Sequence, residues 1–278
     1  MIYKIILKRS KIMKKILALV LAAVLCTFAF VSCGASDDKT ITVAASSTPH
    51  AEILEQCKPI LAEKGYTLDI KVMSDYITPN TATDSGDVDA NYFQHQPYLD
   101  SFNAEKGTKL STVVKVHYEP LGIYAGTSSS LDLADGAVVI IPNDPTNGAR
   151  ALLLLEANGL IELKDGVGVN ATVKDITSNP KNLDIREMEA ALIPGVLSEA
   201  AIGVINGNYA IGAGLKVADS LAQEEADSEA AQTYANILVV KEGHEDDEKI
   251  KALADALLTD AIRDYINNSY EGAVVPIF

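Results

Sequence analysis

The fold is decided by ITVAASSTPHAEILEQCKPILAEKGYTLDIKVM, residues 41–73. Residues 41–45 are apolar enough to form a buried strand, and residues 66–73 alternate between apolar and polar side chains as a second strand does. Residues 48–65 lie between them and have the pattern of a helix. Its start and end have residues typical of those places: Thr48, Pro49 and Gly65. A strand, a helix and a second strand in this order predict a parallel sheet of the α/β class.

A second α/β unit follows along the chain. Residues 136–142 (GAVVIIP) predict a strand, residues 149–158 a helix and residues 201–207 a further strand. Two long extended passages, 110–126 and 234–243, would connect the two units. Ligands on such units bind at the carboxyl ends of the strands, so we expect two lobes with a ligand cleft between them. The remaining patterns predict a strand within 86–93 and helices over 97–107 and 246–270.

The N-terminus is typical of a processing segment. Two lysines precede an apolar run, Ile16–Val31, which is short for a membrane span and has the length of a signal-peptide core. The run ends in FVSC, which resembles a bacterial lipobox, although Phe30 stands where Leu is usual. We therefore expect residues 1–32 to be a lipoprotein signal peptide and residues 33–40 to be a tether lipidated at Cys33. The lipid would hold the protein on the extracytoplasmic face of the bacterial cell membrane.

The charge balance argues against nucleic acid as a partner. The net charge of the 278 residues is −15, and residues 1–32 contain six lysines and arginines and no acidic residue. The other 278 − 32 = 246 residues therefore carry −15 − 6 = −21, which repels phosphate backbones. Without the signal peptide only Cys33 and Cys57 remain, so we expect no disulfide framework and no cysteine metal site. Cys57 fits a small apolar position in a helix.

Residues 141–159 (IPNDPTNGARALLLLEANG) indicate an anion site. We expect Arg150 in the first turn of the helix, beside backbone N–H groups that have no partner within the helix. The helix dipole disfavours a cation at this end, unless an anion lies between the arginine and the N–H groups. A guanidinium group can bind a carboxylate or phosphate through two parallel hydrogen bonds. The alternative is a surface arginine with no ligand.

Aromatic and amide side chains gather at other predicted strand ends. The turn in NYFQHQPYL, residues 91–99, contains proline, and such turns usually carry polar residues. Its rings indicate either the wall of a ligand site or packing at the edge of a lobe. The aromatic candidates are Tyr76, Phe93, His95 and Tyr98. The amide candidates are Asn147, Asn206 and Asn236, with Asn208 as a weaker one.

Catalytic patterns are missing from the sequence. The segment HEDDE, residues 244–248, lacks the second histidine of a zinc-protease helix, and no G-x-S-x-G segment occurs. The chain has four histidines and no clear acid–base pair. We therefore expect no catalytic residue, no metal and no cofactor.

The longer motifs span nearly all of residues 41–278. They are TPHAEIL (48–54), DY-x-x-PN (75–80), NYFQHQPYLDSFN (91–103), VHYEPLGIY (116–124), IPNDPTNGARALLLLEANGLI (141–161), VKDITSNPKNL (173–183), VINGNYA (204–210) and YANILVVKEG (234–243). Together they resemble the methionine-binding lipoprotein family, the substrate-binding subunits of the methionine ABC importer. The motifs are long and occur in the same order, so the resemblance is specific.

The resemblance implies a two-lobed periplasmic-binding-protein fold of type II. Lobe 1 would contain residues 41–119 and 238–278, and lobe 2 residues 120–237. Arg150 would pair with the ligand carboxylate, helped by Asn147. Asn206 and Asn236 would form hydrogen bonds with the ammonium and carboxylate groups. The thioether side chain would be enclosed by Tyr76, Phe93, His95 and Tyr98.

The resemblance further implies a monomeric, lipid-anchored protein that captures L-methionine. It would deliver the amino acid to a membrane permease driven by a cytoplasmic ATPase. One alternative is a relative that binds D-methionine, a methionine-containing dipeptide or another small amino acid. Others are an enzyme on the same two-lobed fold, as in some lyases of menaquinone synthesis, and a surface adhesin without a transport role.

Overall fold

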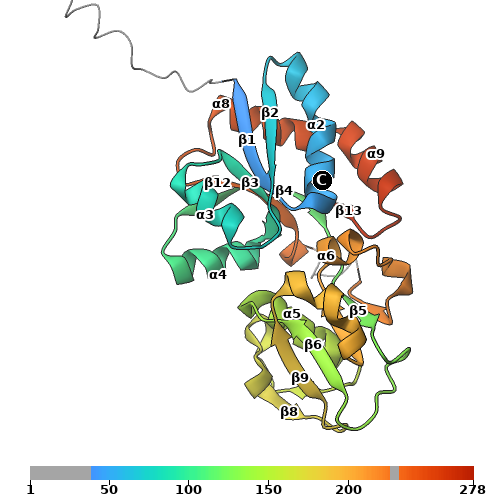
Figure 1. The fold of residues 1–278 in the computed structure, drawn as a ribbon. Coiled ribbons are helices and arrows are strands. Elements are labelled where there is room, and N and C mark those ends of the chain that lie inside the picture. The colour runs from blue at the N-terminus through green and yellow to red at the C-terminus, as the bar shows by residue number, and fades with distance from the viewer. Residues whose placement is uncertain (1–38, 226–231) are drawn as a thin grey trace, which may run out of the picture. The chain divides into compact units, whose positions relative to one another are not determined.

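The computed structural model describes residues 39–225 and 232–278. The predicted signal peptide, residues 1–32, and the predicted lipidation site, Cys33, lie outside these ranges. Within the described ranges, no helix has both the length and the apolar character needed to cross a membrane. The described chain contains two larger sheets, each covered by helices (Figure 1).

The first sheet has six strands in the order β13-β4-β12-β3-β1-β2. β1 is parallel to β2 and β3, whereas β12 is antiparallel to both β3 and β4, and β13 is antiparallel to β4. The strands are β1 (Thr40–Ala45), β2 (Thr67–Val72), β3 (Ala90–His95), β4 (Leu110–Tyr118), β12 (Asn236–Lys241) and β13 (Val275–Pro276). The parallel pair β1–β2 confirms the α/β prediction from residues 41–73.

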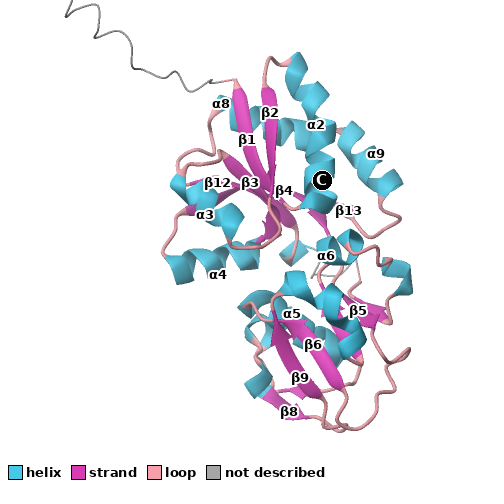
Figure 2. Cartoon of the chain, in the orientation of Figure 1, coloured by secondary structure: helices cyan, strands magenta, loops and turns pink. Residues whose placement is uncertain are grey.

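Helices cover both faces of the first sheet (Figure 2). One face packs against α2 (Glu52–Glu63), α8 (Glu248–Leu257) and α9 (Asp260–Ser269), and the other against α3 (Thr78–Ser85) and α4 (Gln96–Lys106). The packing of β12 on both faces explains why residues 237–240 are all apolar. Leu238 and Val240 pack in the core with α2, while Ile237 and Val239 pack with Leu99 of α4. A strand buried on both faces needs apolar residues at every position.

The first helix starts later than predicted. The expected helix, residues 48–65, is divided into a short turn, η1 (Ser47–Ala51), and α2. Thr48 has the extended backbone of an N-cap, with φ −131° and ψ 136°. Its hydroxyl, however, donates to the Glu52 carboxylate at 2.7 Å and caps no backbone N–H group. Gly65 ends the segment with φ +79°, a conformation that glycine adopts without strain. Cys57 is buried in α2 as a free cysteine, as predicted.

The second sheet has five strands in the order β11-β5-β10-β6-β9. β6 is parallel to β9 and β10, and β5 is antiparallel to β10 and β11. A separate pair joins β7 (Glu162–Leu163) to β8 (Ile176–Ser178). The five strands are β5 (Gly122–Ala125), β6 (Val138–Pro142), β9 (Asp184–Met188), β10 (Ile202–Ile205) and β11 (Ala222–Gln223).

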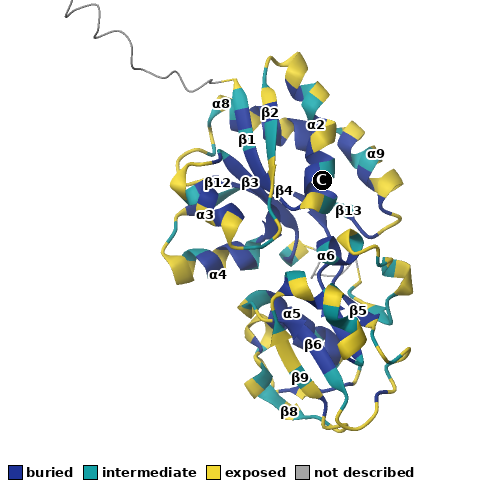
Figure 3. Ribbon diagram, viewed as in Figure 1, coloured by how far each residue is buried: buried dark blue, intermediate teal, exposed yellow. Residues whose placement is uncertain are grey.

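Helices also cover both faces of the second sheet. In β6, Val139 and Ile141 pack in a core with α5 (Pro145–Ala157), whereas Ile140 packs toward η4 (Ala190–Glu199) and α6 (Gly207–Gly212). The central strands of both sheets are buried, and exposed residues lie on the outer helices, the loops and the edge strands β2 and β9 (Figure 3). The short helical turns that complete the chain are η2 (Gly168–Asn170), η3 (Val173–Asp175) and η5 (Val217–Asp219).

The two sheets are joined by extended chain. β4 of the first sheet leads into β5 of the second sheet through residues 119–121, within the passage predicted to be extended. β11 of the second sheet precedes β12 of the first, and β12 lies in the second passage that was predicted to be extended. Residues that end strands in one sheet can therefore meet residues that end strands in the other.

Candidate functional site

One pocket is lined by residues from both sheets. The pocket and its open mouth together contain about 350 Å³ of empty space. All eight residues for which the sequence predicts a ligand contact lie on its wall. The lining residues are Tyr76, Phe93, Gln94, His95, Tyr98, Glu119, Asn147, Arg150, Asn206, Gly207, Asn208 and Asn236.

Strand ends position most of these side chains. Phe93 and His95 lie in the last residues of β3, and Asn206 directly follows β10. Asn147 lies in the first turn of α5, soon after β6 ends. Because the carboxyl ends of strands in open α/β sheets form the usual ligand crevice, this placement fits a binding site.

The aromatic candidates form one cluster in the pocket wall. The ring centroids of Tyr76 and Phe93 are 5.8 Å apart, and those of Tyr76 and Tyr98 are 5.7 Å apart. The Tyr98 hydroxyl donates to the Tyr76 carbonyl at 2.9 Å. Phe93 and Tyr98 are buried and also pack against Phe102. The rings therefore pack with one another and also form an apolar surface that faces the pocket.

His95 links the first sheet to α5. The backbone N–H of Tyr98 donates to His95 Nδ1 at 3.2 Å, so the ring proton lies on Nε2. Nε2 then donates to Asn147 Oδ1 at 3.0 Å. Burial, together with the charge of Arg150, lowers the pKa of His95 to about 4. His95 is therefore neutral at pH 7.

The prediction that Arg150 lies in the first turn of its helix is wrong. α5 begins at Pro145, and the Asp144 carboxylate caps it by accepting from the backbone N–H of Asn147 at 2.9 Å. Arg150 therefore lies in the second turn. Asp before Pro is a typical helix start, whereas the predicted helix, residues 149–158, begins four residues after Pro145. The argument from unpaired N–H groups beside Arg150 fails with this correction.

Arg150 is nevertheless a buried cation on the pocket wall, with an internal partner. Its Nε donates to Glu224 Oε1 at 2.7 Å, and its Nη2 donates to Glu224 Oε2 and to the Glu119 carbonyl. Glu224 also accepts from the Tyr118 hydroxyl and the Leu121 backbone N–H. Burial opposes ionisation of Glu224, but the Arg150 guanidinium holds the pKa of Glu224 below its usual value.

Glu224 is missed by the sequence analysis. It lies in an acidic stretch, AQEEADSEA, residues 222–230, whose composition is that of a solvated loop. Its partner Arg150 is 74 positions away, so no local pattern connects the two.

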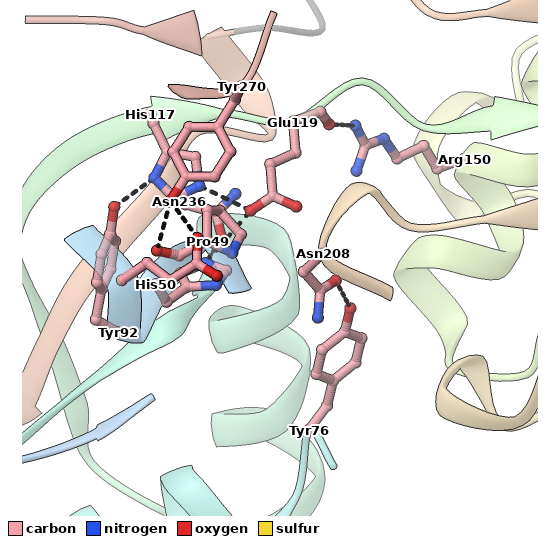
Figure 4. A network of polar contacts seen from close by, with 11 residues as sticks. Pro49, His50, Tyr76, Tyr92, His117, Glu119, Arg150, Asn208, Asn236 and Tyr270 are labelled. Carbon is pink, nitrogen blue, oxygen red and sulfur yellow. Dashed lines mark hydrogen bonds and ion pairs between the residues drawn. The ribbon is translucent and has the colours of Figure 1, made fainter. Parts of the chain in front are cut away.

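Glu119 is a second pocket residue that the sequence analysis misses. It is 4% exposed, and its Oε1 accepts from His117 Nε2 at 2.7 Å (Figure 4). The Tyr92 hydroxyl contacts His117 Nδ1, and His50 Nε2 lies 3.5 Å from the same Glu119 oxygen. Burial lowers the pKa of His50 to about 4 and that of His117 to about 3. The sequence feature that could have identified Glu119 is its position as the one acidic residue in the apolar and aromatic segment VHYEPLGIY.

Among the described residues, one group has the spacing of a metal site. Possible ligand atoms of His50, His117 and Glu119 lie within 4.8 Å of one another. Hydrogen bonds already account for this spacing, since His117 donates to Glu119 and His50 contacts Asn236 Oδ1 at 2.9 Å. We therefore treat the group as a polar network beside the pocket.

The amide side chains differ in which atom they leave for a ligand. Asn206 Nδ2 donates to Asn147 Oδ1 at 2.9 Å, while Asn206 Oδ1 is buried and has no partner among the described residues. Asn208 Oδ1 accepts from the Tyr76 hydroxyl at 2.6 Å, and Asn236 Oδ1 contacts His50. Asn206 thus leaves an acceptor unused, whereas Asn208 and Asn236 have their acceptors occupied.

The pocket combines opposite charges with an apolar wall. Arg150 lies on one side of Glu119 and the histidine network on the other, because the Glu119 carbonyl contacts Arg150 while its carboxylate contacts His117 (Figure 4). A buried ligand with both charges needs partners of both signs. The arrangement fits a small zwitterion with an apolar side chain.

Known proteins resemble this chain over most of its length. The family model described as NlpA lipoprotein matches residues 41–278. The methionine-binding lipoprotein MetQ of Bacillus subtilis is 45% identical, over 93% of this chain and 98% of its own length. The crystal structure of a lipoprotein from Ruminococcus gnavus is 57% identical with a TM-score of 0.85, covering 86% of this chain and 100% of that one.

A further solved structure is that of a nutrient binding protein from Burkholderia cenocepacia bound to methionine. It is 39% identical with a TM-score of 0.81, and it covers 86% of this chain and 100% of its own. The likeness to these binding proteins over the whole described fold confirms the two-lobed periplasmic-binding fold.

Proposed function

Because the chain belongs to the NlpA lipoprotein family, we propose that it captures L-methionine for an ABC importer. The observation that carries the proposal is the pocket, where the Arg150 cation, the Glu119 carboxylate and an aromatic wall meet. A relative named for methionine binding and a structural neighbour bound to methionine support the choice of ligand.

The ligand carboxylate is assigned to Arg150 and Asn236. Glu224 and the Glu119 carbonyl receive bonds from Nε and Nη2 of Arg150, so Nη1 is the nitrogen that we assign to the ligand. Asn236 offers its Nδ2 group, because its Oδ1 contacts His50. Asn206 Oδ1 is assigned to the ammonium group. Asn147 orients this site by accepting from both Asn206 and His95.

The side chain of methionine is assigned to the aromatic wall. A thioether packed against rings gains about 0.3–1.5 kcal/mol per sulfur–aromatic contact beyond its burial. The flexible chain can also adapt to the irregular space between the rings. The wall consists of Tyr76, Phe93, His95 and Tyr98.

Transport requires the lobes to open and close. We take lobe 1 as residues 41–119 and 238–278, and lobe 2 as residues 120–237, with the extended passages as hinges. A ligand that contacts both lobes favours the closed form, because it binds that form more tightly. The lipid at Cys33 would hold a monomer on the outer face of the membrane, beside a permease and its ATPase. In this role the protein needs no catalytic residue and no cofactor.

The test first identifies the molecule that is bound to the purified protein and then titrates the emptied protein with L-methionine. Residues 39–278 form one unit, so the test uses this part of the chain without the N-terminal segment. Mass spectrometry of the molecule released on denaturation should find methionine. Calorimetric titration of the refolded, emptied protein should then give sub-micromolar binding of L-methionine. D-methionine, glycyl-methionine and L-leucine serve as competitors, and a tighter complex with any of them would contradict the proposed ligand.

A further inference from the structure

We propose that Tyr209 stabilises the closed form of the protein and thereby sets how long the ligand stays bound. Tyr209 is a positioning residue, because it does not line the ligand pocket and acts through Tyr76 and the loop that carries Tyr76. The inference rests on the proposed function in one respect, the closing of two lobes over a ligand. It does not depend on which small molecule the pocket binds.

Tyr209 lies in the turn of lobe 2 that also carries two pocket amides. β10 ends at Ile205, and Asn206 and Asn208 follow on the pocket wall. Tyr209 is the next residue in α6, and it lines a different groove, whose other bank includes Ser74 of lobe 1. A movement of this turn relative to lobe 1 therefore moves the two amides together with Tyr209.

A hydrogen bond joins Tyr209 to a loop of lobe 1. The Tyr209 hydroxyl donates to the Ser74 carbonyl at 3.0 Å. Ser74 lies between β2 and α3, where the Asp75 carboxylate accepts from the backbone N–H groups of Ile77 and Thr78 at 2.7 Å each. Asp75 thus fixes the shape of this loop, so the Ser74 carbonyl is held in place for Tyr209.

The Tyr209 ring also packs against Tyr76 of the same loop. The two ring centroids are 4.9 Å apart, and the ring planes differ by 32°. Phe93 and Tyr98 contact the Tyr76 ring from within lobe 1. Because Tyr76 lines the pocket and Tyr209 does not, Tyr209 supports this part of the pocket wall from outside.

Other contacts connect the same turn to lobe 1. The Tyr76 hydroxyl donates to Asn208 Oδ1 at 2.6 Å (Figure 4). The Asn208 backbone N–H donates to the Glu119 carboxylate, and Ile211 of α6 packs against the core of lobe 1. Opening the lobes at this turn would break these contacts together. Tyr209 differs from Tyr76 and Asn208 in one useful way, since it can be replaced without changing a pocket residue.

The bond from Tyr209 to Ser74 would exist only in the closed form, because water would hydrate both groups once the lobes separate. The net contribution of one such bond corresponds to about a twofold to tenfold change in the ratio of closed to open protein. The ligand enters the open form and leaves after the closed form has opened. Losing the bond should therefore speed dissociation and leave association nearly unchanged.

The experiment measures dissociation and association separately. Residues 39–278 are loaded with radiolabelled L-methionine and mixed with excess unlabelled L-methionine, and the loss of label gives the dissociation rate constant. Calorimetric titration gives Kd, and the two together give the association rate constant. Tyr209→Phe removes the hydroxyl and keeps the ring, whereas Tyr209→Leu removes both. Tyr66→Phe is the matched control, because the Tyr66 ring lies against Lys39 and lines neither the pocket nor the groove. Circular dichroism melting checks that each variant folds.

Tyr209→Phe should raise the dissociation rate constant about twofold to tenfold and change the association rate constant less than about twofold. Tyr209→Leu should raise the dissociation rate constant further, because Tyr76 then loses the ring packed against it. Tyr66→Phe should match the wild-type protein. An unchanged dissociation rate constant in Tyr209→Phe would overturn the proposal, and would indicate that α6 stays against lobe 1 when the ligand leaves. A weaker Kd caused by slower association alone would also overturn it, because it would indicate a distorted pocket.

A second ligand separates this proposal from the choice of methionine. The same exchange is run with radiolabelled L-leucine. If L-leucine binds and L-methionine does not, the methionine assignment is wrong. Faster loss of L-leucine from Tyr209→Phe than from the wild-type protein would then support the role of Tyr209, and equal rates would overturn it. If neither amino acid binds, no closed complex forms for Tyr209 to stabilise, and both proposals are wrong.

Discussion

Replacing Glu224 by Gln should destabilise the protein, because it removes the anionic partner of a buried arginine. The side chains of Arg150 and Glu224 are only 4% and 11% exposed. Removing one member of a buried pair costs about 3–5 kcal/mol, and the retained amide places this change near the lower end, at about 3 kcal/mol. For a chain of this size that lowers the melting temperature by about 6–12 °C.

The same substitution should strengthen methionine binding. Glu224 and the ligand carboxylate would bind different edges of one guanidinium group, so they repel each other. Like charges about 4 Å apart repel by about 4 kcal/mol at an effective dielectric constant of about 20, and roughly twice that separation halves the figure to about 2 kcal/mol. The ligand ammonium group offsets part of this repulsion, because Glu224 attracts it. We therefore expect an affinity gain on the order of threefold to tenfold.

Thermal melting of the empty protein and calorimetric titration with L-methionine measure the two effects. Glu105→Gln is the matched control, because its ion pair with Lys106 is exposed and such pairs contribute about 0–1 kcal/mol. An unchanged melting temperature would refute the stabilising role of the ion pair. Weaker methionine binding would refute the competition between Glu224 and the ligand, and would indicate that Glu224 orients Arg150 for binding.

Three further results are expected. Asn236→Ala should weaken L-methionine at least tenfold in calorimetry, since it removes a donor to the carboxylate; an unchanged dissociation constant would remove Asn236 from the ligand contacts. Gly207→Ala should abolish binding, because its Cβ would lie 2.7 Å from the Cβ of Glu119, whereas Gly212→Ala meets no atom within 4 Å and should bind normally; equal binding by both variants would contradict the proposed geometry. The free energy of unfolding in urea should fall between pH 6.5 and about 4, by up to about 1.4 kcal/mol per pH unit for each buried histidine, because the unfolded chain binds protons that the folded chain does not. The raised pKa of Glu119 opposes this trend in part, and equal stability at pH 7 and pH 5 would contradict it. The histidines are His50, His95 and His117.

Local pattern was sufficient to predict the central strands but not their order. The run ILVV in residues 237–240 is apolar at every position, which predicts extended chain buried on both faces. Its place between β3 and β4 depends on pairing with residues more than 100 positions earlier. Sequence periodicity contains no information on such distant partners. The α/β class was therefore predictable, whereas the six-strand order was not.

The candidate site was predictable where residues share a motif. Phe93, His95 and Tyr98 fall in one short segment, and the structure brings them to the pocket wall. Glu119 and Glu224 act through partners distant in the sequence, and acidic residues in extended or polar stretches usually face solvent. The start of α5 was misplaced because Asp-Pro also occurs in turns, and only the cap formed by the Asp144 carboxylate decides between the two.

The strand order of the first sheet has a consequence for biosynthesis. β12 separates β3 from β4, so a growing chain that ends before residue 236 holds β4 and the β1–β2–β3 group without the strand that joins them. β13 adds the outer edge beside β4 later still. Contacts between such distant segments form slowly. The first sheet is thus joined late in synthesis, because β3 and β4 gain their shared neighbour only when residues 236–241 have been added.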